Sequence, residues 1–272
     1  MVRLALGFIA ASFSLSALAS DSKFDLADEL YAQREGNIEM TQAARQEYLK
    51  IAQSSEGADL VRAVTSAART LVYEGEGLTT ADDVETRKSI FRQCFDDVTP
   101  LMSKESLGFE SPAYYYFTAA CMAYYAEVSS TIENLKNFRR LNKILDSGLA
   151  IQGGDIFEGG GLKRVKAAVI SNPKARPIPG GFYNPEAALQ LINEATEGEA
   201  YPGNLPGNMF CENFRRKINV LEELDRIDEA KELASTTIEE FEFLLDLEEI
   251  PEVIISETRH CLNKVSEKLS SL

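Results

Sequence analysis

The sequence predicts an all-α fold in which antiparallel helix pairs form an α-solenoid or a helical bundle. Three observations lead to this prediction. Apolar residues recur at the three- and four-residue spacing of amphipathic helices along most of the 272 residues. No segment shows a convincing strand-like alternation of apolar and polar residues. The helical pattern is interrupted once, by an irregular insertion rich in glycine and proline at residues 153–181.

The first nineteen residues have the layout of a secretory signal peptide. Arg3 gives the basic start, an apolar run follows, and Ala17-Leu18-Ala19 supplies the small residues of a cleavage site. The apolar run is too short to span a bilayer. We therefore expect cleavage near Ala19, export to the periplasm, and a single helical domain over residues 20–272. No cysteine stands near the cleavage site, so a bacterial lipid anchor is not expected.

Four amphipathic helices are expected before residue 110. The first begins near Leu26 and stops at Gly36-Asn37, and the second carries small and aromatic residues on one face. A helix, a glycine turn and a second helix of this kind form the layout of a tetratricopeptide repeat. A third helix is expected over residues 60–71, and Thr80 is expected to cap the fourth.

The next predicted helix, residues 112–125, is rich in tyrosine. Ser111 and Pro112 suit the N-cap and the first helical position. The helix is apolar on nearly all sides, which is typical of a helix in the centre of a core. A second interpretation is open, because tyrosine joins an apolar ring to a hydrogen-bonding hydroxyl and can line a ligand cavity. The candidate ligand-binding residues on this second interpretation are Tyr115, Tyr116 and Tyr124.

Further helices are predicted on both sides of the insertion. A long one covers residues 132–149. It is expected to pack through Leu135, Phe138, Leu141, Leu145 and Leu149. After the insertion, Asn184-Pro185 is expected to start a helix, and Asp225-Arg226 forms the turn of the last clear repeat. Ala230 lets the two helices of that repeat approach closely. A final helix over 251–269 is expected to cap the open end of the solenoid.

The charge of the chain excludes one class of partner. The formal net charge is −15, and removal of Arg3 with the signal peptide makes it −16. A chain this acidic repels phosphate backbones, so nucleic acid is not an expected partner.

Four cysteines in an exported chain are candidates for two disulfides: Cys94, Cys121, Cys211 and Cys261. Three connectivities are open, and Cys94–Cys121 with Cys211–Cys261 is the most local of them. Each bridge would stabilise the fold by about 3–4 kcal/mol on the chain-entropy estimate. Four buried thiols are the alternative.

Signals of catalysis are scarce. The one histidine, His260, stands beside Cys261, and neighbouring residues of a helix point about 100° apart, so the two cannot form a nucleophile–base pair alone. Known nucleophile, zinc-protease and phosphate-loop motifs are absent from the sequence. The cysteines and the histidine also lack the spacing of a zinc site. We therefore expect no enzyme activity, no cofactor and no metal.

The insertion is the stronger candidate for a binding site. Gly159-Gly160-Gly161 precedes a short basic helix, and five cations without an acid lie within residues 163–176. The candidate ligand-binding cations are Lys163, Arg164, Lys166 and Arg176. On one interpretation, backbone amides at the start of this helix bind an anion and Arg164 clamps a carboxylate. On the other, the glycines form only a tight turn and Arg164 pairs with a buried acid.

Four segments together resemble the T component of TRAP-type transporters, a family of periplasmic proteins built from tetratricopeptide-like helix pairs. They are Gly159-Gly160-Gly161 with Arg164, Pro177 to Gly181, Asn184-Pro185-Glu186-Ala187-Ala188, and Asp228-Glu229-Ala230. The resemblance covers about half of the chain well. It implies helices arranged around a pore or groove, with homo-oligomers possible. Because TRAP systems commonly move small organic acids, it also implies a site of carboxylate size.

The function expected from the resemblance is that of a periplasmic, non-enzymatic accessory protein of TRAP-type transport. Such a protein binds a solute-binding P subunit, a small apolar or carboxylate ligand, or both, and hands the ligand over without making bonds. One alternative is a tetratricopeptide scaffold for the assembly of cell-envelope proteins, with no small ligand. Another is a hydrolase that cleaves glycans with paired carboxylates.

Overall fold

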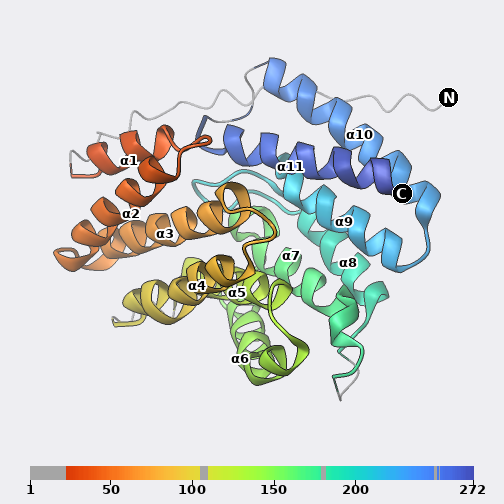
Figure 1. The fold of residues 1–272 in the computed structure, drawn as a ribbon, viewed down its shortest axis with the longest axis horizontal. Helices are drawn as coiled ribbons and strands as arrows, with labels where there is room; N and C mark the ends of the chain where they lie inside the picture. Colours follow the sequence, from red (N-terminus) through yellow and green to blue (C-terminus); the bar gives the residue numbers. More distant parts are fainter. Residues whose placement is uncertain (1–22, 105–109, 179–181, 248–249, 251) are drawn as a thin grey trace.

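The computed structural model describes residues 23–104, 110–178, 182–247, 250 and 252–272. All regular secondary structure in these ranges is helical, which confirms the all-α prediction (Figure 1). The predictions for the signal peptide, for Pro179 to Gly181 and for Pro251 fall outside the described residues.

Eleven α-helices are found in the described residues, joined mostly by short turns. They are α1 (Asp25–Ala32), α2 (Ile38–Gln53), α3 (Gly57–Tyr73), α4 (Val84–Gln93), α5 (Pro112–Glu127), α6 (Thr131–Ala150), α7 (Phe157–Ser171), α8 (Pro185–Thr196), α9 (Cys211–Glu223), α10 (Ile227–Asp246) and α11 (Glu252–Ser271). Wider π-helical turns continue α3 over Glu74–Leu78 and α4 over Cys94–Val98. Short 3-10 segments cover Thr99–Lys104, Pro173–Ala175 and Gly207–Met209.

Most of the predicted helix boundaries correspond to observed caps. The Asn184 side chain accepts a hydrogen bond from the backbone N–H of Ala187, as an N-cap should, and Pro185 follows at the first position. The predicted cap at Thr80 is wrong, because Asp83 caps α4 by accepting from the backbone N–H of Thr86. A carboxylate suits this position because it also interacts favourably with the positive end of the helix dipole.

The packing predicted for α6 is partly wrong. Phe138, Leu141 and Leu145 are buried, but Leu135 is 46 % exposed. Leu135 lies in the first half of the helix, whereas the three buried residues lie further along it. The half of α6 that contains Leu145 and Gly148 approaches α5 closely, since a Cβ built on Gly148 would lie 2.5 Å from the Cβ of Tyr115.

The helices fall into an inner and an outer set. Consecutive helices pack side by side, and α3, α5, α7 and α9 also each contact the next odd-numbered helix (Figure 1). Buried aliphatic and aromatic side chains join α1 to α7 in one core cluster, and a second cluster holds α9, α10 and α11 together. The odd-numbered helices from α3 to α11 therefore form the inner layer of the molecule.

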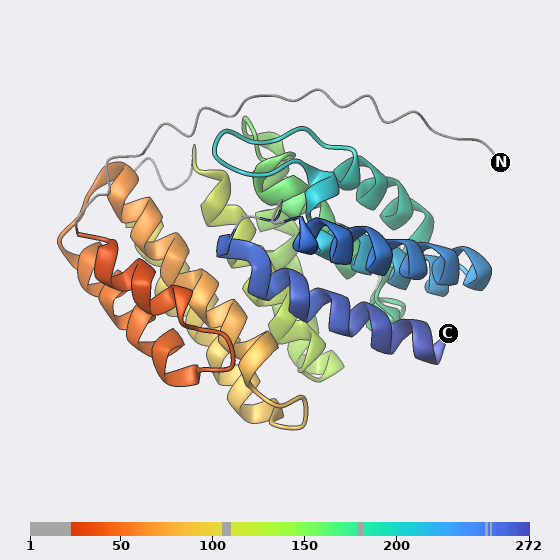
Figure 2. The same cartoon turned by 90° about the horizontal axis from the view of Figure 1, so that it is seen from above.

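The last helix, α11, contacts both the two helices before it and the N-terminal part of the chain. It lies between α9 and α10 on one side and the N-terminal helices on the other (Figure 2). The hydroxyls of Ser256 and Tyr73 hydrogen-bond at 2.8 Å, and Glu257 forms an ion pair with Arg34 at 2.6 Å. A chain segment from the C-terminus thus closes the inner layer against α3 and the loop after α1.

Candidate functional site

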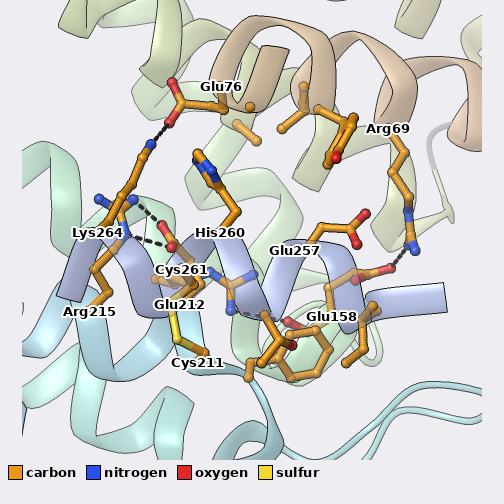
Figure 3. Close-up of a pocket in the computed structure, with 18 of the residues that line it drawn as sticks. Arg69, Glu76, Glu158, Cys211, Glu212, Arg215, Glu257, His260, Cys261 and Lys264 are labelled. Carbon is orange, nitrogen blue, oxygen red and sulfur yellow. Dashed lines mark hydrogen bonds and ion pairs between the residues drawn. A yellow bond between two sulfur atoms is a disulfide. The ribbon is translucent and has the colours of Figure 1, made fainter. Parts of the chain in front are cut away.

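A cavity of about 170 Å³ lies between α3, α5, α7, α9 and α11 (Figure 3). Its wall is mostly apolar, with contributions from Val72, Phe117, Ala120, Met209 and Ile254. Ligand sites in proteins are commonly apolar cavities with a few well-placed polar groups. This cavity is the best candidate for a functional site in the described part of the chain.

Charged side chains surround the apolar wall, and nearly all of them are paired. The pairs are Arg69–Glu158, Glu76–Lys264, Glu212–Arg215 and Glu257–Arg34, with N···O distances of 2.5, 2.7, 2.5 and 2.6 Å. Burial opposes ionisation of Glu212, but Arg215 and Arg216 hold the pKa of its carboxyl well below the usual range. The carboxylates on the wall therefore each have a cation beside them.

Arg164 is the exception among the charged groups of the wall. Its side chain is 5 % exposed, and it forms no ion pair with any described residue. Nη1 donates to Asn213 Oδ1 at 2.7 Å and to the carbonyl of Glu158 at 3.3 Å, and Nη2 donates to the Tyr116 hydroxyl at 3.1 Å. All three acceptors are uncharged, so no carboxylate bonds directly to this buried cation, and its charge acts at longer range by helping to lower the pKa of Glu212.

The glycine triplet positions Arg164. Glu158, Gly159 and Gly160 form a left-handed turn with φ values of 50°, 58° and 76°, and the right-handed helix continues from there. A Cβ at Gly160 would lie 2.7 Å from the Cα of Ala195, so the triplet also lets α7 approach α8 closely. The buried Asn213 amide donates to the carbonyls of Gly159 and Gly207 and fixes the turn.

The backbone amides of this turn are used within the fold. The N–H of Glu158 donates to Asn204 Oδ1 at 3.1 Å, and the N–H of Gly160 donates to the carbonyl of Ile156 at 3.2 Å. The glycines therefore form a tight turn, as the second interpretation of this segment predicts. The partner that this interpretation gives to Arg164 is wrong, because Arg164 bonds to the Asn213 amide and not to a buried acid.

Three further polar groups of the wall complete the site. The Tyr116 hydroxyl accepts from Arg164 and has its own hydrogen to donate. The Tyr124 ring stacks on Phe91, and its hydroxyl has no partner among the described residues. His260 Nε2 is buried and likewise unpartnered in that part of the chain. Burial, with Lys264 nearby, lowers the pKa of His260, which favours the neutral ring.

The disulfides have the most local of the three possible connectivities, Cys94–Cys121 and Cys211–Cys261. The first joins the π turn after α4 to α5. The second joins α9 to α11 and forms part of the cavity wall (Figure 3). The disulfide prediction is confirmed, and both bridges are consistent with an exported protein.

The structure brings three of the seven predicted ligand-binding residues to the cavity: Arg164, Tyr116 and Tyr124. The others do not line it. Tyr115 packs beside Gly148 in the core, Lys163 pairs with Glu194 at 3.3 Å, Lys166 pairs with Asp146 at 2.9 Å, and Arg176 pairs with Glu223 at 3.1 Å. These cations are on the outer side of the basic helix or beyond it, where acidic neighbours neutralise them.

Several residues of the wall carried no recognisable signal in the sequence. Arg69, Glu158, Glu212, Glu257 and Lys264 come from four separate helices and belong to no motif. Beyond Arg164, Tyr116, Tyr124 and the two disulfide cysteines, the sequence marks only the single histidine, His260, among the residues of the wall.

No model of a known protein family matches the chain, and none of the curated proteins compared with it matches. Within the described residues, no helix has both the length and the apolar character needed to cross a membrane. The same residues contain no group of His, Cys, Asp and Glu side chains arranged to hold a metal ion.

Proposed function

We propose that the protein is a non-enzymatic binding protein whose central cavity holds a small molecule with a carboxylate head and an apolar body. The observation that carries this proposal is the buried Arg164 guanidinium, which forms no direct ion pair with a described residue while the other charged groups of the wall do. The carboxylate binds Arg164, and the apolar body lies against the side chains of the wall.

The energetics favour an anion at this place. A buried charge is costly unless it is paired, and an arginine–carboxylate contact supplies both charge and directed hydrogen bonds. The three hydrogen bonds of Arg164 use only part of its N–H donors. The Tyr116 and Tyr124 hydroxyls add donors on the same wall. At about 170 Å³ the cavity is smaller than typical drug-sized sites, which supports a small ligand.

Binding without catalysis is favoured by the state of the wall carboxylates. A general acid or base works best with a pKa near the working pH. Burial opposes ionisation of Glu76 and Glu212, yet Lys264 holds the pKa of Glu76 below its usual value and Arg215 does so for Glu212. Both are therefore ionised and engaged in ion pairs, unlike the raised carboxyl of a glycan-cleaving acid.

The resemblance to the T component of TRAP-type transporters supports a place for this binding in the periplasm. The protein would act as an accessory protein that docks a solute-binding P subunit and exchanges the ligand with it, alone or as a homo-oligomer. The helix pairs and the two disulfides are consistent with such an exported protein. The scaffold alternative is less well supported, because α11 packs against α9 and bonds to Tyr73 and Arg34, so it occupies the inner layer that would receive a partner segment.

The test is ligand binding by the mature protein. Native mass spectrometry of protein purified from its own periplasm would show a retained ligand or a co-purifying subunit. A panel of short-chain and aromatic monocarboxylates is then compared with the corresponding alcohols by calorimetry. We expect the carboxylates to bind and Arg164→Gln to weaken them by about 10–150-fold, the range of one charged hydrogen-bonding contact.

Two variants on one helix separate binding from folding. Tyr124→Phe removes an unpartnered hydroxyl from the wall, and we expect it to weaken carboxylate binding about tenfold without loss of stability. Tyr115→Phe is the matched control away from the cavity. Equal affinity for carboxylates and alcohols, or an unchanged affinity of folded Arg164→Gln, would contradict the proposal.

A further inference from the structure

A groove of about 750 Å³ lies between α3, the start of α5 and residues 201–204. The Arg69–Glu158 ion pair separates it from the central cavity. Arg69 and Glu158 line both this groove and the central cavity, and they are the only residues common to the two linings. The Arg69–Glu158 ion pair therefore stands at the boundary between the two spaces.

The pair is partly buried, and the attraction of Glu158 for Arg69 outweighs the effect of burial on the Arg69 charge. The Arg69 side chain is 26 % exposed and that of Glu158 11 %. Glu158 raises the pKa of Arg69 against the effect of burial, and Tyr31 and Glu257 raise it further. Glu257 stands on the same side of the cavity as the pair (Figure 3). A second carboxylate thus already stabilises the Arg69 charge and can continue to do so when Glu158 moves away.

The backbone of Glu158 links the groove to the cavity. Its φ of 50° and ψ of 47° lie in the left-handed region, which costs a non-glycine residue about 1–2 kcal/mol. Its N–H donates to Asn204 Oδ1, on the groove side, and its carbonyl accepts from Arg164 Nη1, on the cavity side. A ligand that draws Arg164 away from this carbonyl would remove one of the hydrogen bonds that hold the backbone of Glu158 in place.

Three arginines mark a path for an anion. Arg62 lines the groove and pairs with Asp28 at 2.8 Å, Arg69 stands at the boundary, and Arg164 lies in the central cavity. Arg62 and Arg69 are seven residues apart on α3, so they lie on the same helix face. A small anion moving inward meets one guanidinium after another, and a carboxylate can replace Glu158 as the partner of Arg69 at the boundary.

We propose that the groove is the vestibule of the central cavity and that the Arg69–Glu158 ion pair is the gate through which a small anion passes between them. This proposal rests on the proposed function only for the identity of the natural ligand. The gate itself can be measured with an anionic probe that needs no knowledge of that ligand.

The experiment places one reactive thiol on each side of the gate. Thr258→Cys introduces a thiol into the central cavity, and Ser66→Cys introduces one into the groove as the matched control. The native cysteines among the described residues are all in disulfides, so a single adduct by mass identifies the engineered site. The probe is the small anionic reagent 2-sulfonatoethyl methanethiosulfonate, and the labelling rate is measured.

Glu158→Gln opens the gate by removing the charge of the carboxylate. We expect labelling of Thr258→Cys to accelerate about tenfold or more in this background, because loss of one ion pair shifts the opening equilibrium on that scale. Labelling of Ser66→Cys should not change. Glu158→Gly is a second variant that removes the carboxylate. Glycine adopts the left-handed conformation of this position without strain, so this variant should fold even if Glu158→Gln does not.

Two outcomes would overturn the gate. One is an unchanged rate for Thr258→Cys with both Glu158 variants folded. The other is a rate in the parent protein already equal to that of Ser66→Cys. The affinity of monocarboxylates for Arg164 is measured separately by calorimetry, so carboxylate binding with an unresponsive thiol would refute the gate and leave the proposed function standing.

Discussion

At the scale of single residues, the turn before α7 shows what glycine contributes. Gly160 has φ of 76°, and a Cβ there would lie 2.7 Å from the backbone of Ala195. We expect Gly160→Ala to lower the free energy of unfolding by about 2–4 kcal/mol, from left-handed strain plus overpacking. Gly203→Ala is the control, because Gly203 has φ of 81° but nothing within 4 Å. Urea unfolding measures both, and equal losses would show that strain alone matters.

Asn213 is the other residue on which the turn depends. It is fully buried, donates to the carbonyls of Gly159 and Gly207, and accepts from Arg164. Asn213→Ala removes all of these bonds at once, and one of the groups that loses a partner is the buried Arg164 charge, so we expect a loss of about 3–5 kcal/mol in urea unfolding. Asn204→Ala, which removes one acceptor for a backbone N–H, should cost about 1 kcal/mol. A loss below that of Asn204→Ala would mean that water replaces the Asn213 amide.

At the scale of the helices, the disulfide between α9 and α11 holds the last helix against the cavity. The Cys211–Cys261 pair encloses 50 residues of sequence separation, against 27 for Cys94–Cys121. On the chain-entropy estimate, replacing both cysteines by alanine costs about 4 kcal/mol for Cys211–Cys261 and about 3.5 kcal/mol for Cys94–Cys121. Hydrogen exchange should also rise along α11 only when the Cys211–Cys261 bridge is removed. Equal exchange in α11 would show that its ion pairs suffice to hold it.

At the scale of the whole molecule, stability is expected to fall in two steps on acidification. Burial and Lys264 lower the pKa of His260, so below about pH 6.5 the unfolded chain binds a proton that the folded one does not. The free energy of unfolding therefore decreases as pH falls from that value, with a slope of at most about 1.4 kcal/mol per pH unit.

The second step begins near pH 4.5, the usual range of a glutamic acid. Burial opposes ionisation of Glu212, but Arg215 and Arg216 keep its folded pKa far lower, so its stabilising contribution is lost as pH falls further. Because the chain has one histidine, His260→Gln should abolish the first step and keep the second. Urea unfolding from pH 7.5 down to about pH 2 measures both steps, and a first step that survives the substitution would assign it to another group.

The sequence by itself determined the helical class and most of the helix boundaries, and it left three disulfide connectivities open, of which the structure has the most local one. The helical class and its boundaries follow from local physics, because apolar spacing and caps such as Asn184 act over a few residues. It also singled out Arg164 and two tyrosines of α5, because a cation after three glycines and a tyrosine-rich helix are local patterns.

Only the tertiary structure decided which residues share the cavity with Arg164. Arg69, Glu158 and Glu257 come from α3, α7 and α11, and no pattern in the sequence brings residues so far apart to one wall. The neutralisation of Lys163, Lys166 and Arg176 by acids of other segments is equally non-local. Whether a charge is paired depends on distances across the inner layer, and helix packing alone sets those distances.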